Sequence, residues 1–398
     1  MDSIFFYRNP ETAAPVDGNL QRLKIAIQPN ISVAGWPTDA GSNALFNFTA
    51  LEDATLVERL RRDGACFCGS LRMSEFGFGL AGNRAGEALA SREADAELVM
   101  DFMGESRLAA VFSSVCGFKP SYGLVSRFGL IGLIPSMECC GILSGSLENI
   151  RKILKSIAGP DERDFSLPEE KAPDFSLQNI DPQKTTIGVI DEAQNALTAE
   201  EKTKFLAALD ELKQAGFNIR KVSFPDFSLF MLVHKIVGSV EASSCAGRYD
   251  AVRYGRRVPG AKNWNEMYLS SRGAAFGTLL KSYLFQGAFF QFQRYDAYED
   301  ACRIRARLLN DMREITTQAD FLAFPATKST SSNTDVNLEN TYAQFASTLF
   351  ANITGQPVLY LPPASEKTSG LQLAGPRLGD AGLIALGEHL LNTHRGGK

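Results

Sequence analysis

Apolar and polar residues recur along this chain with two periods, which predict strands and helices in alternation. Residues 23–28 (LKIAIQ) alternate as a strand does. Residues 55–68 begin with helical spacing and end in a short apolar run, which predicts a helix followed by a strand. Between 146 and 157 the apolar residues again have helical spacing, and Ser146 is the expected N-cap. The first half therefore reads as strand, helix, strand and helix.

The second half repeats this order more clearly. Strand 186–190, helix 198–214 and strand 218–223 form one unit, and a strand–helix–strand of this size implies parallel pairing. The preceding segment 160–184 is rich in Pro, Asp, Glu and Ser, which predicts a surface loop. The remaining predicted elements are helix 295–316, strand 321–325, helix 341–352, strands 358–361 and 371–374, and a helix from Asp380. The whole pattern predicts an α/β protein.

Composition narrows the class of protein. The chain has 398 residues, of which 44% are hydrophobic and 22% charged, as in ordinary globular proteins. A net charge of −4 argues against a binding surface for nucleic acid that covers the whole chain, although a local basic patch remains possible. No apolar run approaches the roughly 18 residues of a membrane span. The first 18 residues resemble neither a signal peptide nor a transit peptide, so we expect the protein not to be secreted.

Cysteine and histidine give no sign of a metal site. The seven cysteines are odd in number and lack paired spacing, which favours reduced thiols in a reducing compartment. The three histidines, His234, His389 and His394, are not spaced as ligands with any of them. We therefore expect buried, reduced cysteines, no metal and no cofactor.

Several phrases, found in order along the chain, resemble one known family. They are "ATLVERLRRDGACFCGSLRMSEFGFG" (54–79), "VCGFKPSYGLVSRFGLIG" (115–132), "GRYDAVRYG" (247–255), "YDAYEDACRIRARL" (295–308) and "GLQLAGP" (370–376). From about residue 22 to 395 the chain resembles the amidase signature family, and most of all its branch of A subunits of the Glu-tRNA(Gln) amidotransferases.

The resemblance implies the amidase signature fold, with one mixed central sheet flanked by helices on both faces. It also implies a single domain over residues 1–398. Relative to the family, we expect the chain to be shortened at its N-terminus and to lack about twenty residues of an active-site loop near 77–100.

Family members cleave amides with a Ser–cisSer–Lys triad. A serine hydroxyl needs a base to take its proton, and a lysine serves only if burial keeps it neutral. The resemblance places Gln28 where the family has the lysine, Ala81 at the bridging serine and Glu105 at the nucleophile, with Asp101 matching a family acid. A shift of one residue would instead make Ser106 the nucleophile. On the first alignment the triad is lost.

Two further family positions bind the charged groups of the substrate, and the resemblance places Tyr283 and Phe345 there. Charged recognition of free glutamine would be lost with both. The segment 84–97 carries six charges in fourteen residues, which cannot be buried unpaired. We expect this segment to face solvent or a partner.

A run of basic and aromatic residues at 248–257 suggests RNA contact. Arg253, Arg256 and Arg257 could bind phosphates while the tyrosines stack on bases. The alternative is that this run belongs to the structural pattern shared by the family. Only Arg256 and Arg257 then lie outside that pattern.

These observations lead to three hypotheses. The first is a catalytically inactive, amidase-like structural subunit of a larger assembly in organellar translation or a ribonucleoprotein. It would have protein partners, contact RNA through the complex and lie in mitochondria, or otherwise in the cytoplasm. The second is an active glutaminase or amidase subunit of a Glu-tRNA(Gln) amidotransferase that uses Ser106, with a lysine outside the motif as base. The third is an RNA-binding module.

Overall fold

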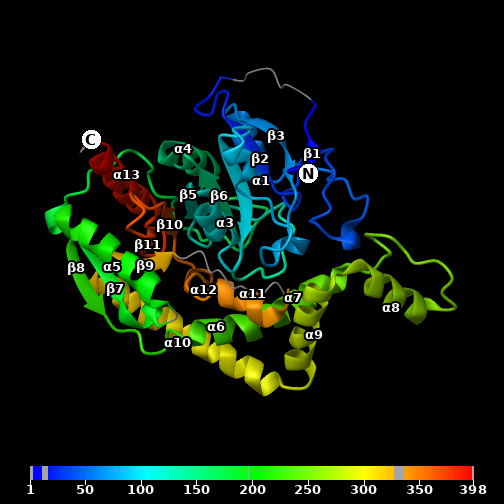
Figure 1. Ribbon diagram of the computed structural model, residues 1–398. Helices are drawn as coiled ribbons and strands as arrows, with labels where there is room; N and C mark the ends of the chain where they lie inside the picture. The colour runs from blue at the N-terminus through cyan, green and yellow to red at the C-terminus, as the bar shows by residue number, and fades with distance from the viewer. Residues whose placement is uncertain (1–2, 11–16, 196, 327–335, 397–398) are drawn as a thin grey trace.

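One eleven-stranded mixed sheet runs through the molecule and carries helices on both faces, as the resemblance implies (Figure 1). The computed structural model describes residues 3–10, 17–195, 197–326 and 336–396. The strands are β1 (Phe5–Arg8), β2 (Lys24–Ile27), β3 (Cys66–Leu71), β4 (Ala96–Asp101), β5 (Cys116–Lys119), β6 (Cys139–Ser144), β7 (Thr186–Ile190), β8 (Asn218–Val222), β9 (Phe321–Ala326), β10 (Val358–Leu361) and β11 (Gly370–Ala374).

The helices follow the order that the sequence predicts, with additional helices between them. They are α1 (Thr55–Arg62), α2 (Glu87–Ala90), α3 (Glu105–Ser113), α4 (Leu147–Ile157), α5 (Ala199–Gln214), α6 (Leu229–Val233), α7 (Ser239–Cys245), α8 (Trp264–Ala275), α9 (Thr278–Phe292), α10 (Tyr295–Gln318), α11 (Leu338–Gln344), α12 (Leu349–Thr354) and α13 (Asp380–Gly396).

The strand order is β1-β3-β2-β4-β6-β5-β10-β11-β9-β7-β8. Strand β2 pairs in parallel with β3 and β4, and β7 pairs in parallel with β8 and β9. The pairings between these groups, from β4 through β6, β5, β10 and β11 to β9, are antiparallel. The parallel pairing of β7 with β8 confirms the predicted strand–helix–strand unit.

The two largest apolar clusters lie on the two faces of this sheet. One contains residues of α1, α4, α5 and α13, and the other contains residues of α3, α6, α10 and α12. Amphipathic stripes explain this arrangement, because the helices that pack on the sheet turn their apolar sides toward it. In α5, for example, the buried residues are Phe205, Ala208, Leu209 and Leu212.

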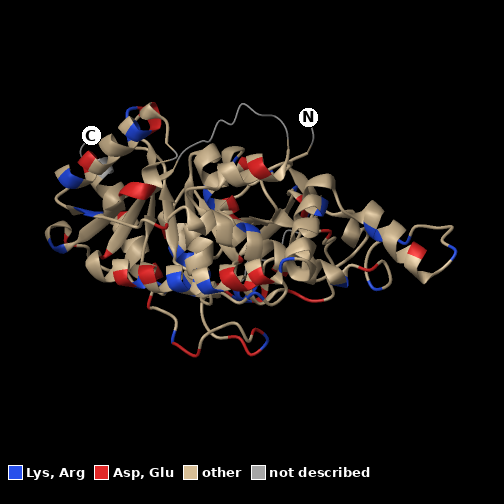
Figure 2. Ribbon diagram, turned by 90° about the horizontal axis from the view of Figure 1, so that it is seen from below, with Lys and Arg blue, Asp and Glu red and all other residues tan. Residues whose placement is uncertain are grey.

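Lys/Arg and Asp/Glu residues are interspersed along the ribbon (Figure 2).

The structure corrects three predictions about elements. The predicted helix 341–352 is two helices, α11 and α12, because the chain turns at Phe345 and places Thr348 beside the end of β4. Ser146 does precede α4, but its side chain makes no capping hydrogen bond. Glu97, predicted to be exposed within 84–97, is fully buried in β4. Its carboxylate avoids isolation by accepting the N–H groups of Gly86 and Leu89.

One helical stretch, Leu229–Arg248, is long and apolar enough to cross a membrane, although no uninterrupted apolar run in the sequence predicted it. More than half of its apolar window is buried within the protein. Core helices of globular proteins pass the same test, so length and composition alone are weak evidence for a span.

Candidate active site

The turn between β4 and α3 holds the residues that the motifs single out. Strand β4 ends at Asp101, and α3 begins at Glu105. The turn needs Gly104, whose φ is 130°. A Cβ at this position would also lie 2.3 Å from Thr348 Oγ1. Glycine therefore allows both the backbone conformation and the close approach of α12.

Glu105 folds back onto this turn. Its Oε2 accepts hydrogen bonds from the backbone N–H groups of Phe102, Met103 and Gly104, at 2.9, 2.8 and 3.1 Å. Its Oε1 is buried without a hydrogen-bond partner. Burial, and then the charge of Asp101, raises the pKa of Glu105 well above its ordinary range. Three converging backbone donors form a nest that suits an oxyanion, and this carboxylate fills it.

Ser106 and Arg107 both bind Asp101. Ser106 Oγ donates to Asp101 Oδ2 at 2.5 Å, and Arg107 Nη2 donates to Oδ1 at 3.1 Å. Asn352 from α12 donates to the same Oδ1 at 2.9 Å. All four side chains are buried. Burial alone would raise the pKa of Asp101, but the charge of Arg107 outweighs it and holds that pKa below its ordinary value. The carboxylate is therefore ionised and orients the Ser106 hydroxyl.

A buried lysine belongs to the same charge cluster. Lys119, at the end of β5, donates from Nζ to Pro120 O at 2.9 Å and lies 3.9 Å from Cys139 Sγ. Cys139 Sγ is in turn 3.8 Å from the carbonyl oxygen of Asp101. Burial lowers the pKa of Lys119, and the charges of Cys139 and Asp101 oppose this only in part. A lowered pKa makes the proton of this lysine easier to remove, as a catalytic base requires.

Gln28 and Ala81 precede this turn in the sequence. Gln28 is buried after β2, where its Oε1 accepts the N–H of Met100 at 2.9 Å and its Nε2 donates to Asn83 at 3.3 Å. Ala81 is exposed in the loop before Asn83. Within the described residues, no hydrogen bond joins Gln28 to Glu105. The structure thus places Gln28 against β4 but leaves Ala81 at the surface.

Aromatic residues close the other side of the Glu105 turn. Tyr283 and Phe345 are fully buried, and the Tyr283 ring stacks on Phe78 with 4.3 Å between centroids. The hydroxyl oxygens of Tyr283 and Tyr342 are 3.2 Å apart. Tyr342 in turn lies 2.9 Å from His234 Nδ1. Two tyrosine hydroxyls and an imidazole therefore line this wall.

His234 stands between this wall and the turn. Its Nε2 donates to the carbonyl oxygen of Phe102 at 2.8 Å, which makes Nδ1 the acceptor for Tyr342. Burial lowers the pKa of His234 to about 4, so the ring is neutral at physiological pH. Among the described residues, no group of three or more His, Cys, Asp or Glu side chains is arranged to hold a metal.

Four important residues were not assigned a role from the sequence: Lys119, His234, Tyr342 and Asn352. Lys119 stands in the Lys-Pro-Ser-Tyr-Gly phrase, and that position is the only sequence signal for any of them. The others reach the turn from 132 to 251 residues away in the chain. A local sequence pattern cannot predict contacts between residues so far apart in the chain.

The three arginines suggested for RNA lie on the surface between α7 and α8. Arg253 pairs with Asp250 at 3.1 Å and also donates to the Arg248 carbonyl. Arg257 donates to the Ala251 carbonyl at 3.4 Å. These contacts are local to the loop, and RNA contact by this region stays a prediction.

Comparison with known proteins identifies the family. The sequence matches the family model described as "Amidase" over residues 10–87 and 85–384, which is most of the chain. The chain belongs to the amidase family. It is 32% identical over 413 aligned positions to the A subunit of the glutamyl-tRNA(Gln) amidotransferase of Natronomonas pharaonis, covering 96% of this chain and 98% of the relative.

Further relatives and solved structures resemble this chain over most of its length. The A subunit of the Lactobacillus johnsonii glutamyl-tRNA(Gln) amidotransferase is 30% identical, over 94% of this chain and 85% of the relative. The crystal structure of the A subunit of this amidotransferase from Thermotoga maritima shares the fold with a TM-score of 0.77, at 20% identity over 96% of this chain and 85% of that one. A solved structure described only as an amidase has a TM-score of 0.76 at 24% identity, over 95% of this chain and 86% of that chain.

These comparisons contradict the first hypothesis, that of an inactive, purely structural subunit. Relatives that match nearly the whole chain are named as A subunits of amidotransferases, and structural neighbours are named as an amidase or as hydrolases. The hypothesis rested on lost residues at three triad positions and two substrate-binding positions. Ser106, one residue after Glu105, donates its hydroxyl to the Asp101 carboxylate.

Proposed function

We propose that this chain is the amide-cleaving subunit of an amidotransferase, of the same type as the A subunits it resembles, with Ser106 as its nucleophile. The observation that carries the activity class is the 32% identity over 96% of the chain to the A subunit of a glutamyl-tRNA(Gln) amidotransferase. By that relative's name, the reaction class is amide transfer and the acceptor is a glutamyl-tRNA(Gln). We propose glutamine as the amide donor, as the family resemblance implies.

The described residues support each part of this chemistry. Asp101 accepts the Ser106 hydroxyl at 2.5 Å and so orients it. Lys119 is the candidate base, because it is buried in the same cluster, linked to Asp101 through Cys139, and burial lowers its pKa. The N–H groups of Phe102, Met103 and Gly104 converge as an oxyanion site requires, once the Glu105 carboxylate gives way to the substrate. Attack would place the serine proton on the base, which then returns it to the leaving ammonia.

Ammonia release from glutamine by the purified protein tests the proposal, measured with its co-purifying partners present. Ser106→Ala should reduce turnover by about a thousandfold or more, since removal of a nucleophile leaves only background catalysis. Ser113→Ala, on the same helix α3, is the matched control and should leave turnover unchanged. Turnover that survives Ser106→Ala, or no turnover by the wild-type assembly, would overturn the proposal.

We also propose that the chain works with a partner protein, as the word "subunit" in its relatives' names suggests. Helix α9 supports this with an exposed ridge made of Thr278, Ser282, Phe285, Phe289 and Phe292. The three phenylalanines are 73%, 51% and 73% exposed. The ridge repeats at intervals of four and three residues and carries no charge, which suits an apolar helix packed along it. The proposed occupant is an amphipathic helix of another subunit.

Stoichiometry tests this docking surface. The tagged chain, purified from its own cells, should retain a partner at fixed stoichiometry and lose it in a Phe285→Ser/Phe289→Ser variant. Phe165→Ser removes a phenylalanine from a distant loop that is 97% exposed, more than any in the ridge, and is the control. Self-association through the ridge would identify a second copy and overturn the heterologous partner. A mitochondrial location and RNA contact through Arg256 and Arg257 remain predictions from sequence.

A further inference from the structure

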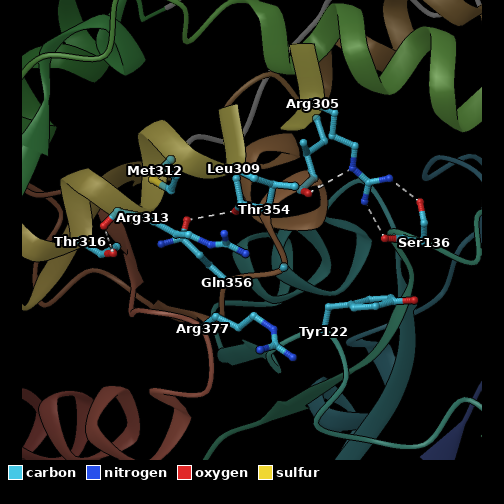
Figure 3. A pocket seen from close by; sticks show the side chains of 12 residues that line it. Tyr122, Ser136, Arg305, Leu309, Met312, Arg313, Thr316, Thr354, Gln356 and Arg377 are labelled. Atoms are coloured by element: carbon cyan, nitrogen blue, oxygen red, sulfur yellow. Dashed lines mark hydrogen bonds between the residues drawn. The ribbon is translucent and has the colours of Figure 1, made fainter. Parts of the chain in front are cut away.

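A cavity away from the Glu105 turn is lined by three arginines. It measures about 280 Å³ and lies between α10, the end of α12 and the loops after β5 and β11. Arg305 and Arg313 come from α10, and Arg377 and Tyr122 come from the loops on the other side (Figure 3). Among the described residues that line it, none is acidic. The cavity therefore concentrates positive charge without a counter-charge in its own wall.

Arg305 builds the inner end of this cavity. Its guanidinium donates to Ser136 Oγ at 2.6 Å and to the Ser136 carbonyl at 2.8 Å, as Figure 3 shows. Glu241, outside the lining, is 3.9 Å away. Arg305 is thus held rigidly by its neighbours, and its charge is only weakly compensated. The walls are further fixed because Gln356 donates to the carbonyl of Gly375 at 3.1 Å.

The other two arginines keep most of their donors free. Arg313 donates once, to Asn310 at 3.4 Å, and makes no ion pair with a described residue. Arg377 lies beside Gly123, next to Tyr122, and its only counter-charge among the described residues is Glu170 at 3.6 Å. An exposed ion pair of this length contributes little to stability, so Glu170 compensates the charge of Arg377 only weakly. Two guanidinium forks are therefore available from opposite walls.

The geometry points to a phosphate-binding site, with a phosphate oxyanion held between Arg313 and Arg377 and facing Arg305. A planar carboxylate satisfies one guanidinium fork at a time, whereas the oxygens of a tetrahedral phosphate point to several sides and can engage two forks together. The second negative charge of a phosphate also matches the excess positive charge of the three arginines. This inference does not depend on the proposed amide chemistry.

The source of the phosphate is either free phosphate or the phosphate of a nucleotide. A neighbouring cavity, lined by Tyr122, Tyr295 and Tyr298 among others, shares Tyr122 and Ser136 with the arginine cavity. Aromatic rings at that place offer stacking surfaces for a base attached to the phosphate. The two sources therefore predict different affinities for phosphate and for a nucleoside monophosphate.

Calorimetric titration of the full chain at low salt tests the site. Inorganic phosphate should bind, and acetate should bind at least about tenfold more weakly. Arg313→Gln and Arg377→Gln should each raise the Kd for phosphate about tenfold, because each removes a charge-assisted contact. Arg303→Gln is the matched control, since Arg303 is on α10 but pairs with Asp300 at 2.8 Å and does not line the cavity.

The outcomes separate the sources and the proposal itself. AMP that binds more tightly than phosphate, with the same sensitivity to both arginine variants, identifies a nucleotide as the ligand. AMP that binds equally or more weakly identifies free phosphate. No phosphate binding at millimolar concentration, or binding that neither variant weakens, would overturn the site. Both arginines are exposed, so their variants should fold, which a thermal melt checks directly.

Discussion

Asp101 shows how one buried charge is made tolerable. Its carboxylate receives donors from Ser106, Arg107 and Asn352, so both oxygens are occupied. The ion pair with Arg107 is fully buried. A pair of this kind adds little net stability, but removing one partner leaves an uncompensated charge in the core.

We therefore predict that Arg107→Ala destabilises the protein by about 3–5 kcal/mol. Denaturant unfolding at neutral pH measures this change. The exposed pair of Arg303 with Asp300 is the comparison, and Arg303→Ala should cost less than about 1 kcal/mol. Equal effects of the two substitutions would show that the Asp101 charge has another compensating partner.

Glu97 gives a pH dependence with a definite sign. Burial raises its pKa from 4.5 to about 7, against the opposing effect of the N–H groups of Gly86 and Leu89. A raised pKa means that the folded protein binds the proton more tightly than the unfolded chain. This contribution to stability is fully present below about pH 4.5 and is lost as pH rises to about 7.

The prediction is that Glu97→Gln flattens the fall in unfolding free energy across that window. Glutamine cannot ionise, and its side chain has one oxygen acceptor where the carboxylate has two, so the absolute stability of the protein also changes. The slope, not the absolute stability, is the quantity to compare, by urea unfolding at several pH values. Glu93 is half-buried, and the hydrogen bond from Arg8 lowers its pKa, so Glu93→Gln should leave the slope across this window almost unchanged.

At the scale of elements, glycine sets how closely helices α7 and α9 pack. A Cβ at Gly287 on α9 would lie 1.8 Å from the carbonyl oxygen of Ser239 on α7. The two helices touch backbone to backbone there, which only glycine allows. Gly273 on α8, by contrast, has no neighbour within 4 Å of its would-be Cβ.

Alanine at these two glycines should therefore act in opposite directions. Gly287→Ala forces the helices apart and should destabilise by about 1–3 kcal/mol. Gly273→Ala should stabilise by about 0.5–1 kcal/mol, because it restricts the unfolded chain without a clash. Thermal unfolding of both variants measures the difference. A neutral Gly287→Ala would mean that α9 can shift without cost.

Element order was largely readable from the sequence because hydrophobic periodicity reports which face of a segment is buried. It predicted β7, α5 and β8 and their parallel pairing. It failed at 341–352, where the apolar period continues through the turn that brings Thr348 to Met103. Motif spacing pointed to Gln28 and Glu105, which the structure places against β4 and just after it, but it did not reveal their partners. The groups that complete the site come from distant strands and helices, which a local pattern does not encode.

At the scale of the whole molecule, the sheet joins two halves of the chain through β5 and β10, with Phe118 opposite Leu359. Cys116, Cys139 and Cys140 lie in β5 and β6 near this junction and are buried. Burial raises the pKa of Cys139 to about 12. Thiol reagents attack the thiolate, so these three cysteines should react only when the sheet opens.

A coloured disulfide reagent should thus titrate the cysteines in two phases at pH 8. The half-buried group (Cys66, Cys68, Cys245 and Cys302) should react first, and Cys116, Cys139 and Cys140 only at the rate of global unfolding. Cys302→Ser should remove one equivalent from the early phase alone. Rapid modification of all seven in native buffer would show that the centre of the sheet opens locally.

The bonds from Asn352 to Asp101 also carry a consequence for biosynthesis. Asp101 and Arg107 emerge from the ribosome some 250 residues before the amide and carbonyl groups of α12 that complete their cluster. Until then, Asp101 and Arg107 have each other as partners but lack the hydrogen bonds from the α12 region. The surroundings of Asp101 and Ser106 can therefore mature only after α12 has been synthesised, and a chain that ends before α12 should leave this region exposed to chaperones.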